Sequence, residues 1–203
     1  MKTTRLEAFS DGVIAILITI MVLEFRTPAG HDWTALWTLR TKFCAYVLSF
    51  IYLGIYWNNH HHMLQLTERV NGRILWANLH LLFWLSLTPF ATAWMGDAQL
   101  APVPTAVYGI VLFLAGAAFN ILEHLIIASQ GAHSPLRAAV GSDVKGKASV
   151  LLYAIAITAS FWLPWIAAAI YALVALMWLV PDPRIERRVG GIAHDLRSHH
   201  KDC

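Results

Sequence analysis

Charged side chains are scarce in this sequence. Asp, Glu, Lys and Arg make up only 13% of its 203 residues, against about 25% in a typical soluble domain. Apolar residues make up 58%, and the mean hydropathy is +0.55. Too few polar side chains remain to cover a water-soluble globule of this size, and a disordered chain is excluded as well. Because the apolar stretches are unbroken, without the alternation of a membrane β-barrel, we expect an all-α polytopic membrane protein.

Cysteines and catalytic motifs are also missing. The two cysteines, Cys44 and Cys203, set no disulfide framework and are typical of free thiols in a reducing compartment. No nucleophile motif, phosphate-binding glycine loop or pair of carboxylates is present. We therefore expect no enzyme activity, no cofactor and no resident metal. The net charge of +3 does not by itself indicate a nucleic-acid partner in a membrane protein, and we expect none.

Long apolar runs are what the sequence does contain. A helix crosses a hydrocarbon core of about 30 Å with roughly 20 residues, and four runs reach that length: Leu6–Phe25, Phe43–Leu64, Ile74–Met95 and Val107–Ile127. A fifth region, Ala148–Val180, is too long for one span, and Pro164 near its middle predicts a hairpin over Trp162–Trp165 between two short spans. The sequence thus predicts six spans within residues 1–181 and a short cytoplasmic tail over 182–203.

The positions of the basic residues test this count. With six spans and both ends inside, the inner segments hold 12 Lys and Arg residues and the outer segments hold 3. With five spans the tail moves outside and the division becomes 7 against 8. Cytoplasmic segments are enriched in Lys and Arg, so six spans with both termini in the cytoplasm are favoured.

Several polar residues lie inside the apolar runs, where they are costly and therefore informative. Asp11 at the start of the first run has two interpretations: it or Ser10 caps a helix N-terminus, or it braces neighbouring helices. The consecutive histidines 60–62 suggest a metal site, but neighbouring helical residues point in different directions and no carboxylate or cysteine partners follow at ligand spacing. A structural, hydrogen-bonding role is favoured for them.

One pattern in the first run is distinctive. Arg5, the stretch Phe9-Ser10-Asp11-Gly12-Val13, and then Ala15-Ile16, Thr19 and Leu23-Glu24 closely resemble the first helix of the transmembrane protein 175 potassium channel family. Tyr56-Trp57 with His60-His61 resembles the second helix of that family, and Asn78-Leu79 with Leu87–Thr92 resembles the third. Beyond about Gly96 only hydropathy and span count match.

The resemblance implies a potassium channel in the cell (inner) membrane, with six spans per repeat and the first helix of each repeat lining the pore. Since this chain holds a single Phe-Ser-Asp motif, and therefore one repeat, four copies are expected to form one pore as a homotetramer. K⁺ is then the permeant ion, with no cofactor. In the family, the motif bonds to neighbouring helices and braces the pore helix. The residues expected to do so here are Arg5, Phe9, Ser10, Asp11, Trp57, His60, His61 and Asn78.

A stripe on the first helix is the expected pore lining. Ile16, Thr19, Ile20 and Leu23 recur at helical spacing, and the constriction positions of the family fall on Ile16 first. The alternative is that this stripe faces lipid or the protein core, because Ile14, Leu17, Ile18 and Met21 are equally apolar. Glu24 either concentrates cations at the outer end or is an interfacial residue. The alternative functions left open are a secondary carrier and a non-transporting membrane scaffold.

Overall fold

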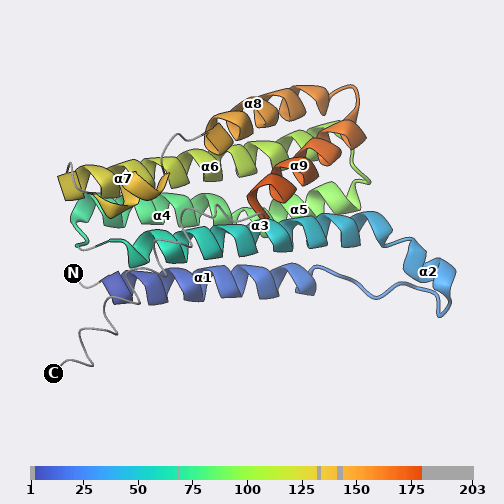
Figure 1. Cartoon of the computed structure of the whole chain (residues 1–203). Coiled ribbons are helices and arrows are strands. Elements are labelled where there is room, and N and C mark those ends of the chain that lie inside the picture. Colours follow the sequence, from blue (N-terminus) through green and yellow to red (C-terminus); the bar gives the residue numbers. More distant parts are fainter. Residues whose placement is uncertain (1–2, 68, 132–133, 141–143, 180–203) are drawn as a thin grey trace, which may run out of the picture.

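The computed structural model describes residues 3–67, 69–131, 134–140 and 144–179. Within these ranges every regular element is a helix, and the long helices lie side by side with α1 at one edge (Figure 1). The expected cytoplasmic tail over 182–203 lies outside the described residues. In chain order the helices are α1 (Thr3–Leu23), α2 (Trp33–Trp37), α3 (Arg40–Gln65), α4 (Gly72–Ser86), α5 (Thr88–Asp97), α6 (Pro102–Gln130), α7 (Pro135–Val140), α8 (Val144–Ala159) and α9 (Pro164–Leu179).

Three helical stretches are long and apolar enough to cross a membrane: Thr3–Leu23, Gly72–Asp97 and Pro102–Gln130. Helix α3 has 26 residues, but its C-terminal part carries asparagines and histidines. Helices α8 and α9 have 16 residues each, which at 1.5 Å per residue gives about 24 Å. The all-helical architecture is therefore as expected, while the number of six spans stays a prediction.

The third expected span, Ile74–Met95, lies within Gly72–Asp97, one of the stretches long and apolar enough to cross a membrane, and it contains a break that the sequence analysis did not specify. Helix α4 ends at Ser86 and α5 begins at Thr88. Pro89 has no N–H to donate, so it is tolerated only in the first turn of a helix. The N–H of Leu87 instead bonds to the carbonyl oxygen of Trp84 at 3.2 Å, which tightens the chain at the break.

The expected hairpin at Trp162–Trp165 is present. Helix α8 ends at Ala159 and α9 begins at Pro164, with Trp162 74% exposed and Trp165 64% exposed. The short helices α2 and α7 fall in segments that the sequence marked only as breaks. Asp32 caps α2 by accepting a hydrogen bond from the amide of Ala35, and this bond, followed by that of the Thr34 hydroxyl, lowers the pKa of the Asp32 carboxyl.

The interior has two apolar clusters joined through α3. The first packs α1, α4 and α6 against the C-terminal half of α3, and the second packs α5, α6, α8 and α9 against its N-terminal half. Tyr56 contacts both clusters. The first cluster holds α1 in place, and the second cluster attaches the α8–α9 hairpin to the other helices.

Hydroxyl groups run through the second cluster. Tyr52 donates to the backbone oxygen of Tyr171 at 2.7 Å, and the Tyr171 hydroxyl donates to the backbone oxygen of Thr105 at 3.2 Å. Ser49 lies 3.0 Å from the Tyr108 hydroxyl. Buried polar groups in an apolar setting are stable only when they are hydrogen-bonded, so these bonds fix how α3, α6 and α9 pack.

Candidate functional site

Helix α1 has one face against the protein. The buried positions follow each other three or four residues apart, so they form one stripe. They are Leu6, Ser10, Ile14, Leu17 and Met21. This stripe packs on α3, α4 and α5.

The opposite face of α1 is uncovered in the single chain, and it contains the expected pore stripe. Ile16 is 57% exposed, Ile20 38% and Leu23 79%, and Thr19 is exposed as well. The hydroxyl of Thr19 donates to the backbone oxygen of Ile16 at 2.8 Å, which leaves the lone pairs of its oxygen unused. An apolar face of this length requires a cover of lipid or of protein.

Three of the expected bracing residues form a buried chain of hydrogen bonds between α1, α3 and α4. The amide nitrogen of Asn78 donates to Ser10 Oγ at 3.0 Å, and Asn78 Oδ1 lies 2.7 Å from His60 Nε2. Ser10 in turn donates to the backbone oxygen of Leu6 at 2.9 Å. All three side chains are fully buried. Since Asn78 Oδ1 is an acceptor, His60 Nε2 carries the proton, and His60 Nδ1 is left without a partner among the described residues.

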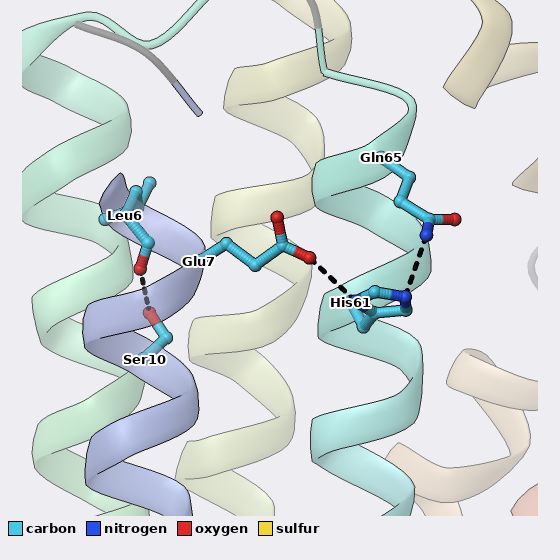
Figure 2. A network of polar contacts seen from close by, with 5 residues as sticks. All are labelled: Leu6, Glu7, Ser10, His61 and Gln65. Carbon is cyan, nitrogen blue, oxygen red and sulfur yellow. Dashed lines mark hydrogen bonds and ion pairs between the residues drawn. The ribbon is translucent and has the colours of Figure 1, made fainter. Parts of the chain in front are cut away.

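A second contact between α1 and α3 involves a residue that the sequence argument did not include. Glu7 Oε1 lies 2.7 Å from His61 Nδ1, and His61 Nε2 lies 2.8 Å from Gln65 Nε2. Figure 2 shows Glu7 reaching from α1 to His61 on α3. The ring of Trp57, which is 45% exposed, stacks on His61 with centroids 6.1 Å apart. Glu7 lies one helical turn before Asp11, but this spacing alone does not indicate a partner on α3.

The remaining residues that were expected to brace α1 take no part in these contacts. Arg5 is exposed and makes no hydrogen bond or ion pair with the described residues, and Phe9 is 53% exposed. Asp11 is half-buried, and its Oδ1 has no partner in the described part of the chain. The helix-cap interpretation of Ser10 and Asp11 is wrong, because α1 already runs from Thr3 and both residues lie in its interior.

The histidines of α3 do not converge. His60 faces Asn78, and His61 faces Glu7. Across the ranges that the structure describes, no three His, Cys, Asp or Glu side chains are grouped as metal ligands would be. The polar site is thus a set of hydrogen bonds that holds α1 by one face.

Comparisons with known proteins agree with this architecture. The family model described as "Endosomal/lysosomal potassium channel TMEM175" matches residues 5–89. A potassium channel of Chryseobacterium sp. (strain P1-3) is 54% identical over 187 residues, which cover 92% of this chain and 97% of the relative. A potassium channel of Streptomyces collinus is 35% identical over 129 residues, covering 60% of this chain and 63% of the relative.

A solved structure has the same fold. The crystal structure of a lysosomal potassium-selective channel TMEM175 homolog from Chamaesiphon minutus superimposes with a TM-score of 0.77 at 27% identity, covering 88% of this chain and 96% of that one. The fold and its apolar helices define an all-helical, multi-pass membrane protein. The chain belongs to the TMEM175 family and is a prokaryotic-type member of it.

Proposed function

We propose that the chain is one subunit of a potassium-permeable channel. The observation that carries the proposal is the division of α1 into two faces. One face is anchored by buried packing and by the Ser10–Asn78 hydrogen bond, and the other presents Ile16, Ile20 and Leu23, which the described residues leave exposed. A helix held in this way can offer its free face to a shared axis. The relatives named as potassium channels supply the ion.

One helix cannot enclose a pore, so the proposal includes assembly. Four copies around one axis would bring four α1 helices together in a closed cyclic arrangement. Each chain would cross the cell (inner) membrane six times, counting the α8–α9 hairpin as two short spans, with both termini in the cytoplasm. The distribution of 12 basic residues inside and 3 outside supports this orientation.

The proposed constriction is a ring of four Ile16 side chains. No carbonyl filter of the Thr-Val-Gly-Tyr-Gly type occurs in the sequence. A narrow apolar ring controls ion passage by losing its water, and Na⁺ loses more hydration free energy there than K⁺ does. The free lone pairs of the Thr19 hydroxyl, one turn further on, would replace part of the hydration shell. Ile20 and Leu23 would continue the apolar lining.

The bracing residues would keep α1 upright in this assembly. The hydrogen bonds of Asn78 to Ser10 and His60 within one chain support this role. Arg5 and Phe9 are exposed, and Asp11 Oδ1 has no partner among the described residues, so we place the partners of these three side chains in the neighbouring subunit.

A secondary carrier is the second candidate, and one observation favours it. Carriers often use helices that are broken within the membrane, and α4 and α5 are such a pair, separated at Leu87. The free face of α1 has no comparable break. A non-transporting scaffold would share the fold and show no ion flux.

The test is a measurement on purified protein in a planar lipid bilayer, together with the subunit count by native mass spectrometry. We expect a tetramer and ohmic single-channel steps carried by K⁺. A slow, saturable and coupled flux would support the carrier instead. No K⁺ flux in any lipid or at any voltage would overturn both transport proposals.

A further inference from the structure

A partly open cavity of about 70 Å³ lies between α3, α6, α8 and α9. No residue of α1 lines it, so it is separate from the proposed pore. Each of the four helices contributes an aromatic side chain to its walls: Tyr56 from α3, Phe113 from α6, Tyr153 from α8 and Trp178 from α9. Surfaces of this kind favour an apolar body over water.

Two amide side chains line this cavity, Asn59 from α3 and Asn120 from α6. The nitrogen of Asn59 donates to the backbone oxygen of Ile55 at 3.0 Å, and the nitrogen of Asn120 donates to that of Gly116 at 3.0 Å. Each amide nitrogen is therefore turned toward its own helix, and each Oδ1 has no partner among the described residues. Both side chains are half-buried and line the cavity.

The other polar groups of the lining add no free donor. The indole N–H of Trp178 donates to Ser149 Oγ at 2.8 Å, and the hydroxyl of Tyr56 is directed to the backbone oxygen of Leu112. Glu123 also lines the cavity, one turn from Asn120, and no Lys, Arg or His does so. The cavity therefore offers amide acceptors and is lined by no cationic side chain, which suits a hydrogen-bond donor and disfavours an anion.

We propose that this cavity is a binding site for a small, uncharged, hydrophobic molecule that carries a hydroxyl group, such as a short-chain alcohol. Its apolar body would lie against Tyr56, Phe113 and Tyr153, and its hydroxyl would donate to the Oδ1 of Asn59 or Asn120. Such a ligand replaces the hydrogen bond of a water molecule at the polar end and removes apolar surface from water at the other. It would also bridge the two apolar clusters, because Tyr56 belongs to both.

The probe is 4,4,4-trifluorobutan-1-ol, observed by ¹⁹F NMR with the full-length protein in lipid nanodiscs. Two matched compounds separate the features of the site: 1,1,1-trifluoropentane has a methyl group in place of the hydroxyl, and 4,4,4-trifluorobutyrate is an anion. We expect saturable binding of the alcohol, about five- to tenfold weaker binding of the alkane, which lacks one hydrogen bond, and none of the anion. Equal binding of alcohol and alkane would overturn the role of the amides.

Variants locate the binding. Gly116 lines the cavity and lies 3.6 Å, measured from an added Cβ, from the Tyr56 hydroxyl, so Gly116→Leu would fill the space. Gly54→Leu on α3 adds the same bulk where an added Cβ meets nothing within 4 Å, and it is the control. We expect Gly116→Leu to abolish saturable binding and Gly54→Leu to retain it. The same signal from both variants would mean partition into lipid only and would overturn the proposal.

A milder variant covers the case in which Gly116→Leu does not fold. Asn120→Leu removes one acceptor and keeps the side-chain volume similar, and its fold is checked by thermal melting without ligand. We expect the affinity for the alcohol to fall about five- to tenfold while that for the alkane is unchanged or rises. An unchanged preference for the alcohol in both Asn120→Leu and Asn59→Leu would overturn the assignment. None of these outcomes depends on whether the chain conducts K⁺.

Discussion

Tyr171 on α9 occupies the space that Gly109 on α6 leaves empty. A Cβ added at Gly109 would overlap the Tyr171 hydroxyl and lie 2.9 Å from Ile157 Cγ1. The Tyr171 hydroxyl cannot retreat, because it bonds to the backbone of Thr105 on α6 and the ring is fully buried. The close packing of α6 on the α8–α9 hairpin therefore depends on a residue without a side chain.

The substitution Gly109→Ala is expected to destabilise the protein by about 1–3 kcal/mol or more, since overpacking of a dense core costs this much. The control is Gly116→Ala on the same helix, where the new Cβ would meet the Tyr56 hydroxyl at an ordinary 3.6 Å. Thermal melting in detergent compares the two. Equal melting temperatures for both variants would contradict the close contact at Tyr171.

The Ser10–Asn78–His60 chain gives the second prediction. Replacing Asn78 by Leu leaves the buried His60 Nε2 and Ser10 Oγ without their partner, at a cost of about 1–3 kcal/mol. Asn120→Ala is the control, because among the described residues the Asn120 side chain bonds within its own helix, to Gly116. We expect Asn78→Leu to melt well below wild type and to lower the tetramer yield, with Asn120→Ala close to wild type. A stable Asn78→Leu tetramer with normal flux would show that the Ser10–Asn78–His60 hydrogen bonds do not brace α1.

The proposed constriction gives the third prediction. An Ile16→Asn substitution in four subunits should wet the ring, raise the single-channel conductance and lower the preference for K⁺ over Na⁺. Ile155→Asn on α8 is the control: Ile155 is 47% exposed, similar to Ile16, but lies on a helix not proposed to line the pore. The measurement compares the single-channel conductance and the K⁺ over Na⁺ preference of both variants in bilayer recordings. If Ile16→Asn conducts like wild type, Ile16 does not form the constriction.

The fourth prediction concerns an asymmetric ion pair between α3 and α5. Lys42 Nζ lies 2.8 Å from Asp97 Oδ1, with side-chain exposures of 10% and 62%. Removing Asp97 leaves the nearly buried ammonium group of Lys42 without its ion-pair partner. Removing Lys42 leaves the Asp97 carboxylate, which water solvates. Asp97→Asn should therefore lower the free energy of unfolding by about 1 kcal/mol, the upper end for a pair with one exposed partner, and Lys42→Met by less. The reverse order of the two melting temperatures would refute this argument.

Much of the helical architecture could be predicted from the sequence. Unbroken apolar runs of membrane-spanning length predicted the helices that became α1, α3 and α6, and Pro164 predicted the turn between α8 and α9. The same rules did not specify the break at Leu87, because a proline in the first turn of a helix and a proline inside a longer helix give the same local sequence pattern.

The residues of the candidate site, too, could be predicted only in part from the sequence. The motif from Arg5 to Asp11 indicated that α1 carries the candidate site. The positions that resemble the second and third helices of the family included His60 and Asn78. Glu7 was not recognised, because a charged residue near a helix end has no signature of its own until its partner His61 is known.

The sequence by itself determined that this chain is a helical membrane protein, because the shortage of charge and the length of the apolar runs are properties of the linear polymer. Only the tertiary structure decided which apolar residues of α1 are buried. Ile14, Ile16 and Leu17 have similar hydrophobicity. Ile14 and Leu17 nevertheless lie against α3, α4 and α5, while Ile16 faces outward. The reason is that hydropathy measures a preference for leaving water and has no direction, whereas the buried bonds of Ser10 and Asn78 fix the rotation of α1 about its axis.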